Sequence, residues 1–155
     1  MKKEFYNVEI INLLPMINKI LEDKEKTKDM PIKFRWALKK NLQAFSSTVN
    51  SFNEFKQELV NELQDEYFND EKSHEETMET EEGTQEFRKI NDEYMEEYKT
   101  KVDELNDKLR ELLGERNEYE IHTYDIDDFV TNLPNDTALE FDDIELFSFM
   151  AVEEE

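Results

Sequence analysis

The sequence "IKFRWALKKNLQAFSSTVNSFNEFKQELVNEL", residues 32–63, decides the expected fold. Its apolar side chains recur mostly in steps of three and four, the spacing that places them on one face of an α-helix. The pattern is heptad-like, with Lys56 at a position where an apolar residue would be expected. A helix from about residue 32 to 67 is therefore predicted, and at 1.5 Å per residue it would be ~50 Å long. Its apolar stripe consists of Leu38, Leu42, Phe45, Val49, Phe52, Leu59 and Leu63.

A second apolar stripe of the same spacing runs from Phe87 to Leu112. Gly114 follows it, where a glycine that ends a helix belongs. Residues 69–84 between the two stripes are almost wholly polar and are expected to form a turn. Two amphipathic helices joined by a polar turn most simply make an antiparallel hairpin. The second stripe consists of Phe87, Ile90, Tyr94, Tyr98, Val102, Leu105, Leu109 and Leu112.

The flanking segments predict shorter elements. Residues 8–22, "VEIINLLPMINKILE", have helical spacing, with Asn7 as a plausible cap and Pro15 expected to kink or interrupt the helix. Residues 118–126, "EYEIHTYDI", alternate with a period of two and are the best strand candidate, with residues 2–10 as the natural pairing partner. Residues 126–133 and 137–151 indicate short helices.

The predicted fold class is therefore mainly α. It is a long antiparallel helical hairpin with short N- and C-terminal helices and a small two-stranded β-ribbon. We expect one domain over residues 1–155, made of an N-terminal element (1–30), the hairpin (31–113, with its polar turn near 69–84) and an acidic C-terminal segment (114–155).

Composition narrows the class of protein. The chain has 11 Phe, 6 Tyr and a single Trp, enough bulky side chains to build a core despite its high charge. It has no cysteine, which excludes disulfides and thiolate metal sites and suggests a reducing compartment. No apolar run approaches the ~20 residues of a membrane span. We therefore expect a cytoplasmic protein.

Charge is distributed unevenly around a net value of −22. Residues 1–45 carry ten Lys and Arg against six Asp and Glu, whereas residues 46–155 carry nine against 35. Such an acidic body repels nucleic acid and anionic membranes, and it attracts basic protein surfaces. A solvated surface that serves only solubility is the alternative.

Catalytic and metal chemistry finds little support. The "EKSH" sequence at 71–74 has the Glu-x-x-His spacing of di-iron bundles, but the second such pair that those sites need is missing. The only glycines are Gly83 and Gly114, so phosphate-cradling loops and dinucleotide fingerprints are excluded. Weak cation binding by "DIDDF" at 125–129 stays open. We expect no enzyme activity, no cofactor and no dedicated metal site.

Two surfaces remain as candidate partner-binding sites. Phe147 and its aromatic neighbours either form an exposed patch ringed by acids or pack into the core as part of a C-terminal helix. Trp36, in the most basic stretch, is interpreted as a core residue rather than part of a basic contact patch. The acidic face comprises Glu58, Glu62, Asp65, Glu66, Asp127, Asp128, Asp142 and Asp143, and the apolar patch comprises Phe141, Phe147 and Phe149.

The pattern of the chain resembles small bacteriophage-encoded accessory proteins. The resemblance rests on a short N-terminal element, two long charged helices and an acidic segment such as "YEIHTYDIDDF" followed by "LEFDDIELFSFM". It implies a viral accessory role in the host cytoplasm. One hypothesis is an inhibitor that imitates nucleic acid, in the manner of anti-CRISPR proteins, and occupies a basic nucleic-acid-binding surface of a host effector. The other is an assembly chaperone or minor virion component. The heptad stripe could pair within the chain or in a homodimer.

Overall fold

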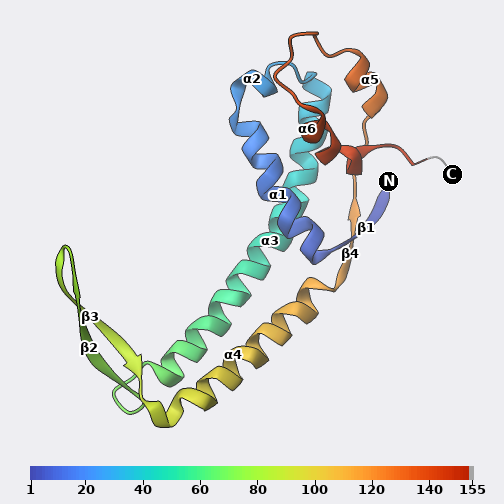
Figure 1. Ribbon diagram of the computed structural model, residues 1–155. Coiled ribbons are helices and arrows are strands. Elements are labelled where there is room, and N and C mark those ends of the chain that lie inside the picture. Colours follow the sequence, from blue (N-terminus) through green and yellow to red (C-terminus); the bar gives the residue numbers. More distant parts are fainter. Residues whose placement is uncertain (154–155) are drawn as a thin grey trace. The chain divides into compact units, whose positions relative to one another are not determined.

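The computed structural model describes residues 1–153 (Figure 1). Within that range the chain forms two compact units, one from Met1–Ser51 with the residues from Leu113 onwards and one from Phe52–Leu112. Helix α3, Ile32–Tyr67, contributes residues to both. Its bounds agree with the helix that the apolar stripe predicts.

The first unit contains a sheet, β1 with β4, and the helices α1, α2, α5 and α6 beside the first part of α3. Strand β1 (Lys2–Tyr6) pairs antiparallel with β4 (Arg116–Glu120), and Lys3 lies opposite Tyr119. The helices are α1 (Asn7–Glu22), α2 (Lys24–Thr27), α5 (Ile126–Thr131) and α6 (Phe141–Leu146), and a short 3-10 turn covers Ser148–Met150.

The N-terminal segment pairs with the chain after Gly114, as expected, but the bounds differ from the prediction. Strand β4 ends at Glu120, so residues 121–125 are not part of it. Helix α1 begins at Asn7, with Tyr6 rather than Asn7 as its cap residue. The helix also runs through Pro15, because Ile10, Leu14, Ile17 and Ile20 share a buried face while Pro15 itself is exposed.

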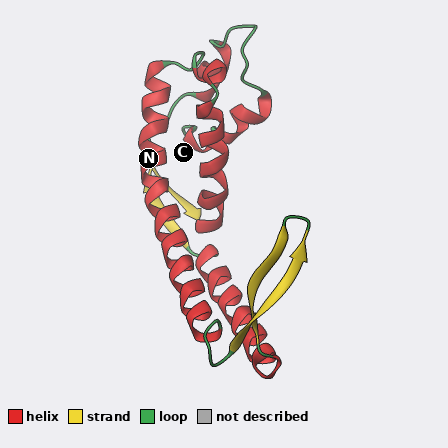
Figure 2. Cartoon of the chain, turned by 90° about the vertical axis from the view of Figure 1, so that its left-hand side faces the viewer, coloured by secondary structure: helices red, strands yellow, loops and turns green. Residues whose placement is uncertain are grey.

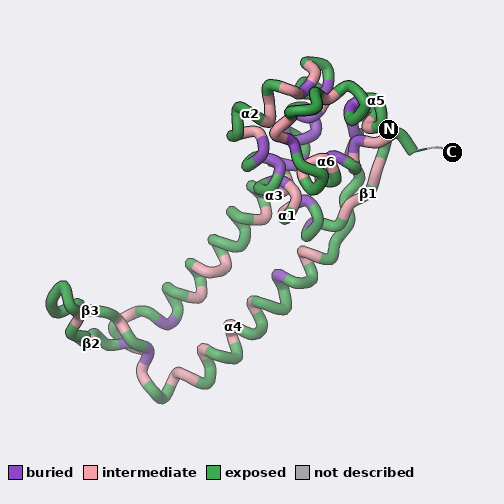
Figure 3. The backbone as a smooth tube through the Cα atoms, turned by 45° about the horizontal axis from the view of Figure 1, so that its top comes forward, coloured by how far each residue is buried: buried purple, intermediate pink, exposed green. Residues whose placement is uncertain are grey.

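The core of this unit is aromatic. Phe34 stacks on Phe129 with 4.3 Å between ring centroids and makes an edge contact with Phe147 at 5.1 Å. A second aromatic group joins Phe5, Phe45 and Tyr119. Buried positions gather in this unit, whereas few occur between Phe52 and Leu112 (Figure 3).

The second unit consists of the remainder of α3, the hairpin of β2 (Ser73–Thr80) and β3 (Gly83–Ile90), and most of α4 (Asp92–Leu113). Figure 2 shows the two strands as a separate antiparallel hairpin joined to these helices. Glu81 and Glu82 form the turn between the two strands. Gly83, which follows them, has a φ of +125°, a backbone conformation that residues with a side chain rarely adopt.

The predicted fold class is therefore wrong. The described residues contain two separate two-stranded sheets rather than one ribbon beside a helical hairpin. The polar turn expected near 69–84 is largely strand β2 and its connection to β3. Phe87 and Ile90, assigned to the second helical stripe, lie in β3, and α4 begins only at Asp92. The strands escaped detection because both faces of the hairpin are largely exposed, which removes the alternation that marks a half-buried strand.

Polar contacts hold the base of this hairpin. Asn69 donates from Nδ2 to the carbonyls of Asp65 and Glu66 and so closes the end of α3. Arg88 donates to the Ser73 hydroxyl at 3.0 Å and to the Asp70 carboxylate at 3.2 Å. These bonds fix the start of β2 without a hydrophobic core beneath the strands.

Candidate functional site

The predicted acidic face on α3 lies in the second unit. Glu58, Glu62, Asp65 and Glu66 are all exposed, and in the described part of the chain none has a basic side chain within ion-pair distance. Glu62 and Glu66 line a groove of about 230 Å³, and its polar residues on α4 are Lys101, Glu104 and Lys108. Glu58 and Asp65 do not line this groove and are open to solvent.

Helix α4 carries a larger acidic surface, which we call the α4 acidic arc. At 3.6 residues per turn, seven exposed acids share an arc of about 120° on this helix. Within that arc Thr100 is the one residue that is not acidic. The apolar positions Tyr94, Tyr98, Val102, Leu105 and Leu109 lie on the opposite side. The arc consists of Glu93, Glu96, Glu97, Asp103, Glu104, Asp107 and Glu111.

The arc has almost no internal counter-charge. Among residues 1–153, Asp107 is its one member with an ion pair, to Arg110 at 3.3 Å, and both side chains are largely exposed. Glu93 to Glu111 spans about 27 Å at 1.5 Å per residue. The seven carboxylates therefore present roughly one charge per 4–5 Å, close to the ~3.4 Å spacing along one DNA strand.

The acids predicted in the C-terminal segment lie in the other unit and have mixed environments. Asp127 and Asp128 are exposed in the first turn of α5, and Asp128 accepts a hydrogen bond from Asn132. Asp142 is exposed, whereas Asp143 accepts from the Glu140 amide at 3.0 Å and pairs with Lys26 at 2.8 Å. The Asp143 carboxylate thus already has partners within the fold, and it stabilises the first turn of α6.

The three phenylalanines of the predicted apolar patch do not share one environment. Phe147 is fully buried against Phe34, and Phe149 is half-buried beside Phe5 and Phe45. Phe141, at the start of α6, is 73% exposed. Phe141 is therefore the one fully exposed member of the predicted patch.

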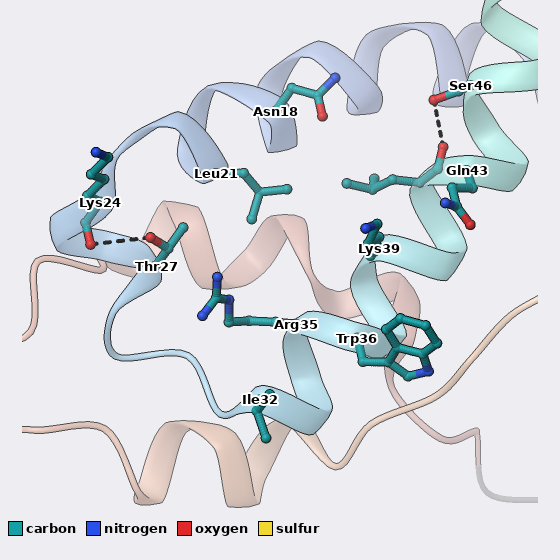
Figure 4. Close-up of a pocket in the computed structure, with 11 residues that line it drawn as sticks. Asn18, Leu21, Lys24, Thr27, Ile32, Arg35, Trp36, Lys39, Gln43 and Ser46 are labelled. Carbon is teal, nitrogen blue, oxygen red and sulfur yellow. Dashed lines mark hydrogen bonds between the residues drawn. The ribbon is translucent and has the colours of Figure 1, made fainter.

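Trp36 lies on the surface, so its interpretation as a core residue is wrong. Its side chain is 61% exposed, and the Lys40 ammonium lies 4.8 Å from the ring centroid. Trp36 also lines a groove of about 740 Å³ formed by α1, α2 and the first part of α3 (Figure 4). Lys24, Arg35 and Lys39 line the same groove, which we call the basic groove.

His74, the histidine of the Glu-x-x-His spacing at residues 71–74, lies in a strand and not in a helical bundle. It lies in β2, where Nε2 contacts the Glu76 carboxylate at 2.9 Å and Nδ1 contacts the Asn91 side chain. The hydrogen bond with Glu76, aided by Asn91, raises the pKa of His74 above its ordinary value. Within residues 1–153 no three His, Asp or Glu side chains are grouped so as to hold a metal ion.

Sequence reasoning missed the α4 acidic arc and the basic groove. The arc follows from the same helical periodicity that identifies the apolar stripe, applied to the acids instead. The exposure of Trp36 was harder to predict, because Phe34 and Leu38, two residues to either side, are both buried. Only the position of Trp36 around the helix, about 160° from each of them, places it on another face.

No helix in the described part of the chain is both long and apolar enough to cross a bilayer. Comparisons with protein-family models, with characterised proteins and with solved structures find no significant match.

Proposed function

We propose that the protein acts by binding, not by catalysis, and that the α4 acidic arc is its contact surface for a basic protein. The partner is a protein whose own role is to bind nucleic acid, and the arc occupies its phosphate-binding groove. The exposed acids of α3, Glu58 and Asp65, extend the same kind of surface. The observation that carries the proposal is the row of seven exposed acids on one face of α4, of which Asp107 alone has an ion pair among residues 1–153.

This row of acids costs stability, which argues against solubility as its sole purpose. Like charges three or four residues apart on a helix destabilise it by about 0.2–0.5 kcal/mol per pair. The arc contains several such pairs, among them Glu93 with Glu97 and Asp107 with Glu111. Bases placed within the arc would keep the protein soluble without this repulsion, but the four bases of α4 all lie outside it, namely Lys99, Lys101, Lys108 and Arg110. A single-sign row suits a surface that must resemble a phosphate backbone.

The resemblance to phage accessory proteins gives the proposal its setting. We propose an inhibitor made during infection that acts in the host cytoplasm on a nucleic-acid-binding effector, as a nucleic-acid mimic does. Long-range attraction between the acidic arc and a basic groove would speed the encounter and weaken with salt.

A comparison of two charge-neutralised variants tests the role of the arc. The arc variant carries Glu93→Gln, Glu97→Gln, Glu104→Gln and Glu111→Gln. The control carries Glu79→Gln, Glu81→Gln, Glu82→Gln and Glu86→Gln, four exposed acids of the β2–β3 hairpin, and so has the same net charge. Tagged proteins are used to capture partners from a bacterial lysate. We expect the arc variant alone to lose a nucleic-acid-binding partner, and equal capture by both variants would contradict the proposal.

An assembly role is the second candidate, and the exposure of Phe141 is the observation that favours it. Structural proteins captured through Phe141 would resist high salt, because burial of an aromatic side chain does not depend on ionic strength in the way that charge pairing does. Phe141→Ala should then abolish capture while the arc variant retains it.

A further inference from the structure

The basic groove lacks internal counter-charge. Lys24, Arg35 and Lys39 line it, no acidic side chain does, and none of the three has a carboxylate within 4.0 Å among residues 1–153. Among nearby cations, Lys26 pairs with Asp143 and Lys28 with Glu25, whereas Lys33 and Lys40 also have no ion pair within residues 1–153. In a chain with 41 acids and 19 bases, a groove that three cations and no acid line favours an anionic group supplied from outside.

The groove also exposes apolar surface. Ile32 is 81% exposed, and Trp36 presents its ring beside it, with Arg35 between α3 and the facing α1 and α2 (Figure 4). Tryptophan and arginine are the residues most often found at the energetic centre of protein interfaces. An occupant of this groove must therefore bring both negative charge and a large apolar side chain.

The chain itself carries such a group, at the start of α6. Ile32, Phe141 and Trp36 are the three most exposed large apolar side chains in the described part of the chain. Phe141 stands between Glu140 and Asp142, two exposed acids that form no ion pair within residues 1–153. An aromatic side chain flanked by carboxylates is the chemical complement of Trp36 flanked by cations.

The fold holds Phe141 outward. Asp143 accepts the Glu140 amide and pairs with Lys26, which fixes the first turn of α6. Further along the chain, Ile144 and Phe147 pack with the core. Phe141 itself is absent from the core cluster and remains 73% exposed.

We propose that the basic groove of one copy binds the Phe141 end of α6 from a second copy. Phe141 packs against Trp36 and Ile32, and Glu140 and Asp142 meet the groove's cations. Because the two surfaces differ, the contact is heterologous, and each copy has one groove and one α6 end to offer. The net charge opposes association at long range, but at physiological ionic strength charges more than ~8 Å apart are largely screened.

A complementation experiment tests this contact. The groove variant, Arg35→Glu with Lys39→Glu, keeps its α6 end, and the α6 variant, Phe141→Ala with Asp142→Asn, keeps its groove. Sedimentation velocity should show wild type associating as its concentration rises and each variant alone at least tenfold weaker. An equimolar mixture should form a dimer and nothing larger, because only one intact groove and one intact α6 end remain per pair. The control Lys33→Glu with Lys56→Glu changes two exposed cations that lie neither in the basic groove nor beside Asp142, and it should associate like wild type.

Trp36 is the sole tryptophan, so its fluorescence reports directly on the groove. A blue shift should accompany association in wild type and be absent from the α6 variant alone. A wild type that stays monomeric, or a mixture that fails to dimerise, overturns the proposal. A monomeric protein whose Trp36 emission responds to a single-stranded oligonucleotide would overturn it in favour of nucleic acid as the occupant. None of these residues belongs to the α4 acidic arc, so failure here leaves the proposed function standing.

Discussion

The side chain of Asn41 binds both backbone groups of His122. Its Nδ2 donates to the His122 carbonyl at 3.0 Å, and its Oδ1 accepts the His122 amide at 2.8 Å. Asn41 is buried, and through these two bonds α3 takes the place of a neighbouring strand for the chain that leaves β4. The contact ties the acidic C-terminal segment to the long helix.

Asn41→Ala should therefore be more destabilising than its size suggests. The substitution removes the partner of both backbone groups of His122, whose bonds to Asn41 are part-buried, and an unsatisfied group costs up to about 1–3 kcal/mol. We expect a loss of ~2–4 kcal/mol by urea denaturation, whereas Asn50→Ala, at an exposed position of the same helix, should change stability by less than about 0.5 kcal/mol. Equal losses of stability for Asn41→Ala and Asn50→Ala would show that the Asn41–His122 contact does not stabilise the chain that follows β4.

Phe34 and Phe141 should respond in opposite ways to truncation. Phe34 is fully buried and contacts Tyr124, Phe129 and Phe147, so Phe34→Ala should cost about 3–5 kcal/mol. Phe141→Ala should change the stability of the monomer by less than about 0.5 kcal/mol. Thermal denaturation at low protein concentration separates the two, and a large loss for Phe141→Ala would mean that this ring packs within its own chain.

Tyr67 should tolerate loss of its hydroxyl. The ring is buried, and the hydroxyl has no partner with hydrogen-bond geometry within residues 1–153, although Glu97 lies near. Burial, followed by the effect of Glu97, raises the pKa of Tyr67 to about 12. Tyr67→Phe should leave the denaturation midpoint unchanged or higher. In contrast, Tyr119→Phe removes a bond to the Thr48 hydroxyl at 2.6 Å and should cost about 1 kcal/mol. A lowered midpoint for Tyr67→Phe would establish a Tyr67–Glu97 bond.

The His74–Glu76 pair makes the hairpin sensitive to pH. The pKa of His74 is raised, so its stabilising contribution is complete below 6.5 and is lost as pH rises through the folded value. The hydrogen bond from His74 lowers the pKa of Glu76. The contribution of Glu76 to the stability of the folded protein is therefore complete above pH 4.5, and it is lost as the pH falls through the pKa of Glu76 in the folded state. The pair is therefore fully effective between pH 4.5 and 6.5. Titration of the His74 ring by NMR should give a pKa above 6.5 that falls in Glu76→Gln, and an unchanged value in that variant would contradict the pairing.

The sequence predicts α3 because every local signal there agrees with its packing. The apolar stripe that includes Leu38, Leu42, Phe45 and Val49 is buried in the first unit, and the helix has the bounds that the stripe indicates. The β2–β3 hairpin could not be found in the same way. Of its side chains only Ser73 and Ile90 are buried, so hydrophobic alternation carries no information about the strands. Gly83 and the threonines at 77, 80 and 84 were the remaining signals of a turn between strands.

Some surface residues could be predicted from the sequence and others could not. The acids of α3 could be placed on an exposed face because the apolar stripe fixes the opposite face. Whether Phe141 or Phe147 would be buried could not be read from "EFDDIELFSFM", since both fit a helix with apolar positions. That choice depends on long-range contacts, chiefly between Phe147 and Phe34 and between Asp143 and Lys26.

The central claim is that the α4 acidic arc takes the place of nucleic acid on a basic protein. The most direct measurement is capture of partners from a bacterial lysate by wild type and by the arc variant, with elution by duplex DNA and by salt and identification by mass spectrometry. We predict a nucleic-acid-binding protein that wild type retains, that DNA or salt releases, and that the arc variant does not retain. Capture that survives competing DNA, or that is the same for wild type and the arc variant, would contradict the claim.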